Sequence, residues 1–142
     1  MEKIITSGKR KTAIAKAVLT SGNGIIKINE INYKNIQFFN KLKIEEPIKI
    51  AEKILGKINF DVAIKVRGGG EKGQIEAARL ALAKAIVEFS KKQNSDGNSL
   101  SKELEKTYLD YDRNMLIADV RRKEAYKPGD SKARKNRQTS YR

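Results

Sequence analysis

The sequence predicts an α+β fold in which helices cover one face of a small sheet. Two segments, residues 12–20 and 60–66, alternate apolar and other side chains with the period of half-buried strands. Two more, residues 44–55 and 75–89, repeat apolar side chains every three or four positions, as helices do. Strands and helices that follow one another in this order favour a sandwich with the helices on one side. No internal repeat is evident.

The N-terminal part is predicted to form a hairpin. Residues 3–6 are a possible first strand, and residues 12–20 place three alanines and Leu19 on one face of a second strand. The Ser-Gly-Asn-Gly sequence at 21–24 supplies the positive-φ positions of a tight turn. We therefore expect residues 25–28 to return beside the preceding strand.

Two helices are predicted in the next segment. Residues 33–43 are ambiguous, and we expect a short helix that buries Phe38 or Phe39. Pro47 suits the first turn of a second helix, because proline lacks the N–H that this turn leaves unpaired. Gly56 is expected to end this helix. The apolar face of the helix is Ile44, Ile48, Ala51 and Leu55.

The second half of the chain is predicted to hold one more strand and two more helices. Residues 60–67 form the clearest strand, and a long helix follows it and ends near Lys92. A polar break at 94–99 separates this helix from a shorter one. The apolar patch at 115–118 is the last anchor of the domain. The shorter helix stacks Leu100, Leu104 and Tyr108 on one side.

The composition excludes several classes of protein. The chain contains no Cys and no His, so it has no disulfides, no thiolate metal site and no histidine base. No stretch approaches the roughly 18 apolar residues of a membrane span, and the N-terminus lacks the apolar core of a signal peptide. We expect an intracellular protein that is not an enzyme, has no cofactor or metal, and takes neither a membrane nor a small-molecule substrate as partner.

Half of the net charge of +14 lies in the C-terminal segment. Residues 121–142 carry nine Lys or Arg, two acids and only four apolar side chains. Four apolar groups cannot offset roughly 1–2 kcal/mol of backbone entropy per ordered residue. We therefore divide the chain into a globular domain, residues 1–118, and an extended basic tail, residues 119–142, that is ordered only on RNA.

A glycine-rich turn joins the clearest strand to the long helix. Gly68, Gly70 and Gly73 satisfy G-x-G-x-x-G, but no strand follows to complete a dinucleotide-binding unit, and Gln74 stands where a phosphate-binding loop requires Lys. Two readings remain: a turn with sharp bends, or a backbone that RNA phosphates approach closely, which we favour. The candidate RNA-binding residues here are Arg67, Gly68, Gly69, Gly70, Lys72, Gly73 and Gln74.

A second basic cluster precedes the strand at 12–20. Lys9, Arg10 and Lys11 follow Gly8 in what we expect to be a loop between two strands. A basic triplet alone is a weak signal, because such triplets are common on protein surfaces. Together with two other basic segments in one small domain, it predicts phosphate contacts.

At these segments the chain resembles a known family, the universal ribosomal protein number nine of the small subunit. The chain ends in Ser-Tyr-Arg, which is typical of the archaeal and eukaryotic form, whereas the bacterial form typically ends in Phe-Ser-Lys-Arg. The matching segments are residues 8–17, 66–74, 119–123 and 137–142.

The resemblance implies a two-layer fold with a small mixed sheet and a left-handed crossover. It places the protein in the cytoplasm, in the head of the small ribosomal subunit, against ribosomal RNA and neighbouring ribosomal proteins. The tail would thread through RNA to the P-site tRNA, which Tyr141 and Arg142 would contact. The remaining implied ribosomal RNA contacts are Arg121, Arg122, Lys123, Lys132, Arg134, Lys135 and Arg137.

The chain departs from the family pattern at two positions in the tail. Val120 stands where the family commonly has Pro, which predicts a less rigid exit of the tail from the domain. Thr139 stands where the family often has Lys, which removes one cation near the tip.

Two other functions are compatible with parts of the sequence. A basic protein that binds nucleic acid without a fixed ribosomal site would show similar affinity for any duplex and a steep salt dependence. A nucleotide-dependent enzyme would use the glycine-rich turn, but the sequence shows no cluster of catalytic side chains.

Overall fold

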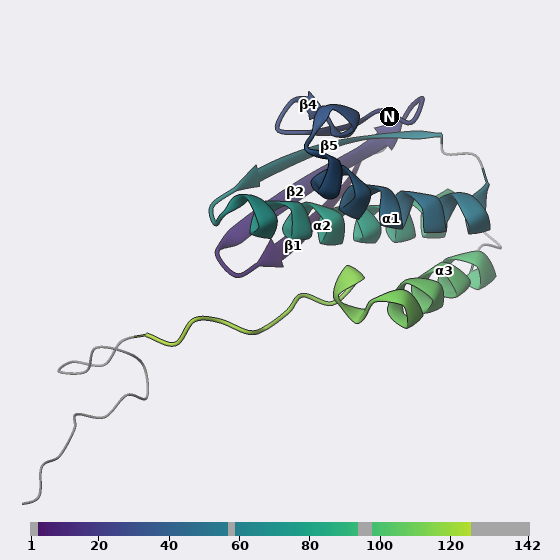
Figure 1. The fold of residues 1–142 in the computed structure, drawn as a ribbon. Coiled ribbons are helices and arrows are strands. Elements are labelled where there is room, and N and C mark those ends of the chain that lie inside the picture. The colour runs from purple at the N-terminus through teal and green to yellow at the C-terminus, as the bar shows by residue number, and fades with distance from the viewer. Residues whose placement is uncertain (1–2, 57–58, 94–97, 126–142) are drawn as a thin grey trace, which may run out of the picture.

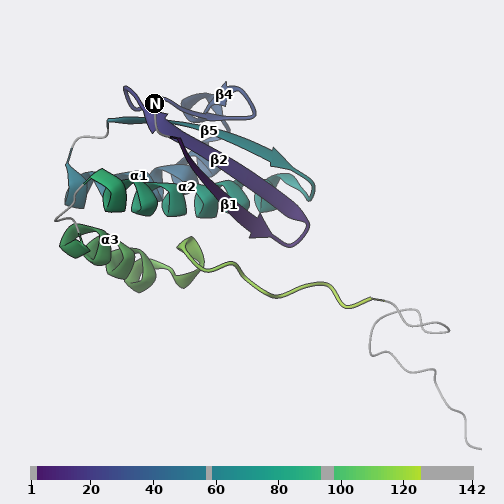
Figure 2. The same cartoon turned by 180° about the vertical axis from the view of Figure 1, so that it is seen from behind.

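The computed structural model describes residues 3–56, 59–93 and 98–125, and these form one mixed sheet with helices on one side (Figures 1 and 2). The strands are β1 Ile4–Arg10, β2 Ala13–Ser21, β3 Ile26–Ile28, β4 Ile31–Asn32 and β5 Phe60–Arg67. The helices are α1 Phe38–Leu55, α2 Glu71–Gln93 and α3 Asn98–Tyr111, with short 3-10 helices η1 Tyr33–Asn35 and η2 Arg113–Met115. The predicted α+β class is confirmed.

The strand order in the sheet is β1-β2-β5-β3-β4. β2 is antiparallel to both β1 and β5, whereas β3 runs parallel to β5 and antiparallel to β4. The parallel pair requires a crossover, and the chain between β3 and β5 supplies it with α1. The predicted mixed sheet is therefore confirmed, while the left hand of the crossover stays a prediction.

The predicted hairpin of β2 and β3 is wrong, because β5 lies between these two strands. β5 pairs with β2 over eight residues and offers an alternating apolar face, so it is a better partner than the three-residue β3. The polar turn at 21–24 is held by β5 instead. The carboxylate of Asp61 accepts the backbone N–H of Asn23 at 2.9 Å and of Ile25 at 2.8 Å.

The core lies between the sheet and the first two helices. The three alanines and Leu19 of β2 are buried, as are the alternate residues of β5 that begin with Phe60. α2 packs across β1 and β2. Close approach is possible because β1 carries Gly8 under the helix, and the Thr6 hydroxyl donates to the Ala81 carbonyl at 2.8 Å.

Two predictions about α1 are wrong. Pro47 lies inside the helix rather than in its first turn, and Phe38 and Phe39 are 63% and 72% exposed. The helix continues through Pro47 because its buried stripe, with Ile44 before the proline and Ile48 after it, needs one unbroken face. Burial of that stripe offsets the hydrogen bond that proline cannot donate. Gly56 ends the helix at a φ of 77°, as predicted.

α3 packs against α1 and α2 on the side away from the sheet, so all three helices lie on one side (Figures 1 and 2). Of the predicted stack on α3, Leu104 and Tyr108 are buried, whereas Leu100 is 39% exposed. The Tyr108 hydroxyl donates to the Pro47 carbonyl at 2.7 Å. Met115 in η2 is also buried and closes this end of the domain. In the described part of the chain, no helix has the length and apolarity to cross a membrane.

Candidate RNA-binding interface

The first basic cluster lies at the end of β1 rather than in a loop between strands. β1 extends to Arg10, which pairs with Ala13, so the turn consists of Lys11 and Thr12 alone. Lys11 has a φ of 52°, a left-handed conformation that this two-residue turn imposes. Lys9 and Lys11 are exposed, and the tight turn fixes the position of both backbones at one end of the sheet.

The glycine-rich turn packs against this β1–β2 turn. Gly68 and Gly69 have φ values of 74° and 67°, a region in which other residues are strained. A Cβ on Gly68 would lie 2.7 Å from the Thr12 carbonyl oxygen, and one on Gly69 would lie 2.9 Å from the Cβ of Ala13. These glycines therefore have a structural reason to be glycine: they let two turns that are distant in sequence touch.

The end of the glycine-rich turn, where α2 begins, has an accessible backbone. A Cβ on Gly70 would meet no atom within 4 Å, so the backbone there is open. α2 begins at Glu71, and the first N–H groups of a helix lack intrahelical acceptors. The Gln74 side chain donates to the Gly68 carbonyl at 3.2 Å and braces the turn. The helix start is thus a place where an anion can approach main-chain donors.

Three basic segments meet at this end of the molecule. A hollow of about 580 Å³ is lined by residues of both the β1–β2 turn and the glycine-rich turn. A second hollow, of about 500 Å³, is lined by Arg10, Lys11 and residues 121–123. We call these three segments, residues 9–12, 67–74 and 121–123, the basic interface. The fold therefore brings together segments that lie more than a hundred residues apart in the sequence.

The basic interface carries eight Lys or Arg side chains and one acid, Glu71. Glu71 accepts a hydrogen bond from the Asn40 side chain at 2.6 Å. Within the described residues, four of these bases form neither an ion pair nor a side-chain hydrogen bond, which leaves their charge available to a polyanion. They are Lys9, Lys11, Arg67 and Lys72.

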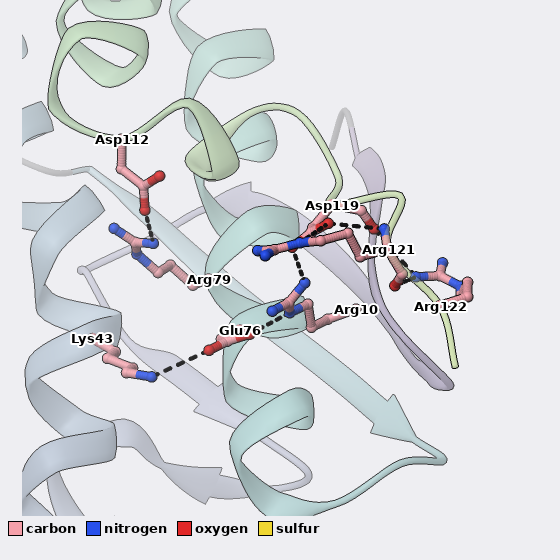
Figure 3. A network of polar contacts seen from close by, with 8 residues as sticks. All are labelled: Arg10, Lys43, Glu76, Arg79, Asp112, Asp119, Arg121 and Arg122. Atoms are coloured by element: carbon pink, nitrogen blue, oxygen red, sulfur yellow. Dashed lines mark hydrogen bonds and ion pairs between the residues drawn. The ribbon is translucent and has the colours of Figure 1, made fainter. Parts of the chain in front are cut away.

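Arg10 differs from its neighbours because two carboxylates hold it. Its Nε lies 2.6 Å from Glu76 of α2, and its Nη1 pairs with Asp119 (Figure 3). Asp119 also accepts the backbone N–H of Arg121 at 2.9 Å and pairs with the Arg121 guanidinium at 2.9 Å. We call Arg10, Glu76, Asp119 and Arg121 the Asp119 cluster. The cluster ties the start of the predicted tail to the β1–β2 turn.

The guanidinium groups determine the charge state of this cluster. Hydrogen bonds from Arg121, together with the nearby Arg10, hold the pKa of Asp119 well below its ordinary value. Burial raises the pKa of Glu76, but the hydrogen bond and charge of Arg10, with Lys43 at 3.4 Å, lower it more, so the net shift is downward. Both carboxylates are therefore ionised at neutral pH and keep Arg10 in place.

A second arginine, Arg79, joins the helices behind the interface. Its guanidinium lies 2.6 Å from Glu46 of α1. It also lies 2.7 Å from Asp112, which caps η2 (Figure 3). Arg79 lines a cleft of about 440 Å³ together with Arg10, Glu76 and Asp119. Because most charges of this cleft are already paired within the protein, it is a less suitable anion site than the basic interface.

The structure places some of the predicted RNA-binding residues together and does not describe others. Lys9, Lys11 and residues 67–74 lie together in the basic interface with residues 121–123. Arg10 and Arg121 are engaged by Asp119, and Arg122 donates to the carbonyls of Asp119 and Arg121 at 3.2 Å. Phosphate contacts for all of them stay predictions. The predicted site residues that lie outside the described part of the chain are Lys132, Arg134, Lys135, Arg137, Tyr141 and Arg142.

Sequence reasoning missed the acidic members of the Asp119 cluster and Arg79. Asp119 is a lone acid beside three consecutive bases, which is a signal for a local ion pair but does not identify Arg10 as the partner. Glu76 and Arg79 lie on the polar side of an ordinary amphipathic helix and carried no signal of their own. The predicted boundary between residues 118 and 119 stays a prediction.

The Asp119 cluster predicts a pH dependence. The pKa of the Asp119 carboxyl is lower in the folded protein than its ordinary value of 3.8. The ionised carboxylate therefore stabilises the fold above pH 3.8, and this contribution is lost as the pH falls toward the folded pKa. We expect the free energy of unfolding, measured with urea at several pH values, to fall below about pH 4, and to fall less steeply in Asp119→Asn. Asp110→Asn removes an exposed carboxylate from α3 and is the matched control. Parallel profiles for Asp119→Asn and the wild type would contradict the prediction.

This geometry defines a class of protein: an α+β domain that gathers cations from several turns on one surface. Within the described residues, no group of three acids is placed to hold a metal ion. Comparison with known proteins makes the class specific. Residues 8–142 match the family described as ribosomal protein S9/S16.

Curated relatives support the same assignment. The chain is 43% identical over 145 residues to the small ribosomal subunit protein uS9 of Methanococcus vannielii, and equally to that of Thermoplasma volcanium, with full coverage of each chain. It is 44% identical over 138 residues to the uS9 protein of Dictyostelium discoideum, covering 96% of this chain and 92% of the relative.

The chain belongs to the ribosomal protein S9/S16 family. Its relatives include archaeal and eukaryotic proteins, as the ending Ser-Tyr-Arg predicted. The predicted class is confirmed: the family consists of structural, non-enzymatic proteins of the small ribosomal subunit, a cytoplasmic particle.

Proposed function

We propose that this protein binds ribosomal RNA in the head of the small subunit through the basic interface, and that its tail reaches the P-site tRNA. The observation that supports this most strongly is the meeting of three basic segments around the β1–β2 turn. RNA phosphates bind favourably to such a surface, since each contact with Lys or Arg releases counterions from the RNA. Open backbone at Gly70 and the start of α2 add main-chain donors.

The Asp119 cluster gives the tail a defined starting point. Residues 119–122 are fixed beside the β1–β2 turn by hydrogen bonds to Asp119, although Val120 stands where the family commonly has Pro. We infer that this cluster supplies the rigidity that the missing proline would have given. The chain beyond it then continues from the basic interface into RNA, and Tyr141 and Arg142 contact the tRNA.

Deletion of residues 138–142 separates the two parts of this proposal. Small subunits that contain the truncated protein should assemble and sediment normally, because the basic interface is intact. Their affinity for tRNA at the P site should be lower than that of wild-type subunits, as measured by filter binding. Normal tRNA affinity would contradict the tRNA contact, and failure of the full-length protein to sediment with subunits in high salt would instead favour a basic protein without a fixed ribosomal site.

A further inference from the structure

The face of the sheet opposite the helices is not covered by any other described element (Figures 1 and 2). Its outward side chains alternate with the buried ones along β1, β2 and β5. At the end of the sheet nearest the basic interface, four of the six outward side chains in the last two rows are cationic. This part of the surface shares Lys9 and Arg67 with the basic interface and extends from it onto the open face of the sheet.

The strand register arranges the outward side chains in rows. The row next to the turns consists of Lys9, Ile14 and Arg67, on β1, β2 and β5. The next row consists of Ser7, Lys16 and Lys65. Because strands lie about 4.8 Å apart and alternate residues about 7 Å apart, the four bases occupy a patch of roughly 10 by 7 Å at the level of the backbone.

The arrangement of Lys16 and Lys65 is unfavourable in the isolated protein. The two lysines are directly opposite each other in an antiparallel pair, where like charges repel. In the described part of the chain, no acid forms an ion pair with any of the four bases. The nearest acid on β5 that faces the same way is Asp61, two rows beyond Lys65, and it is engaged by the turn at residues 23–25. A bound anion would relieve this repulsion.

The chemistry of the face indicates which part of RNA it fits. Sheets that read single-stranded RNA carry exposed aromatic rings on which bases stack. None of the outward positions of β1, β2 and β5 carries an aromatic ring. Lysine and arginine side chains are among the usual partners of phosphate oxygens.

We infer that the two rows nearest the turns form a second RNA-binding surface, with Lys16 and Lys65 as phosphate-binding residues. This inference rests on the proposed function and extends it from the turns onto the open face of the sheet. The partner is the backbone of ribosomal RNA, contacted without regard to base sequence. The basic interface and the sheet face then hold one RNA surface from two sides of the β1–β2 turn.

The test compares two double variants of the full-length protein. Lys16→Gln with Lys65→Gln removes the cross-strand pair, and Lys102→Gln with Lys106→Gln removes two exposed lysines from α3, on the far side of the helices. The probe is a transcript of the head domain of small-subunit ribosomal RNA, and the affinity is measured over a series of salt concentrations. Urea unfolding of each variant shows whether the fold is intact.

The sheet variant should bind the transcript about tenfold more weakly, and the slope of log K against log salt should be shallower by about 1.5 to 2, as expected for two lost phosphate contacts. Its urea midpoint should equal or exceed that of the wild type, because a repulsive pair is removed. A sheet variant that binds like the α3 variant would overturn this inference and leave the proposed function intact. A wild-type protein that binds the transcript no better than an unrelated RNA would overturn both.

Discussion

Replacing Gly8 with alanine is expected to lower the free energy of unfolding by about 3 kcal/mol, at the upper end of the usual cost of overpacking. A Cβ on Gly8 would overlap the carbonyl oxygen of Ala77 and lie 2.7 Å from the backbone nitrogen of Ala81. Both obstacles are main-chain atoms of α2, so they cannot rotate aside as a flexible side chain could. The substitution therefore forces α2 away from β1. Urea denaturation followed by far-UV circular dichroism measures the loss.

Gly70→Ala is the matched control for this substitution. A Cβ on Gly70 meets nothing within 4 Å, and its φ is not positive. We expect the free energy of unfolding to change by less than about 0.5 kcal/mol. If Gly8→Ala and Gly70→Ala had equal effects on stability, the close packing of α2 on β1 would be contradicted.

Replacing Tyr108 with alanine is expected to cost about 4 kcal/mol of stability, as for other large buried aromatic side chains. Tyr108 is fully buried and joins α3 to α1 through its hydrogen bond to the Pro47 carbonyl. Its burial also raises the pKa of the phenol, so the hydroxyl stays protonated and donates throughout the physiological range. Tyr108→Phe keeps the packing and loses the hydrogen bond, and should cost about 1 kcal/mol.

Tyr111 is the control on the same helix. It is 59% exposed, so Tyr111→Ala should change stability by less than about 0.5 kcal/mol in the same urea experiment. Comparable losses for Tyr108→Ala and Tyr111→Ala would show that α3 does not pack on α1 as described. The comparison matters for function because α3 and η2 lead the chain to Asp119.

In β2, β5 and α2 the sequence pattern could predict which residues are buried, but it could not predict which strands are neighbours. The alternation in β2 and β5 gave the inner face correctly, and the stripe of α2 gave its packing face. The turn at 21–24 looked like a hairpin, yet its amides bind Asp61 of a strand that is nearly forty residues later. Pairing depends on how well whole strands match, and local turn residues do not contain that information.

For the candidate site, too, the sequence could predict the residues involved but not how they are arranged. Charge and glycine content identified the three basic segments, because clusters of Lys and Arg are typical of surfaces that bind nucleic acid. Their meeting point could not be predicted, since it depends on contacts between Thr12 and Gly68 and between Arg10 and Asp119. Arg10 was predicted as one more phosphate contact. The structure shows it bound to two carboxylates, which only the folded chain brings within reach, and its phosphate contact stays a prediction.

Site-specific cross-linking in assembled small subunits tests most directly whether the three basic segments form one RNA-binding interface. A photoreactive amino acid is placed in turn at the positions of Lys11, Lys72 and Arg122, and at Glu103 on α3 as control. We predict that the first three cross-link to ribosomal RNA nucleotides that are neighbours in the folded subunit, while position 103 does not reach them. Cross-links from the three positions to RNA segments far apart in the subunit, or to no RNA at all, would contradict the interface.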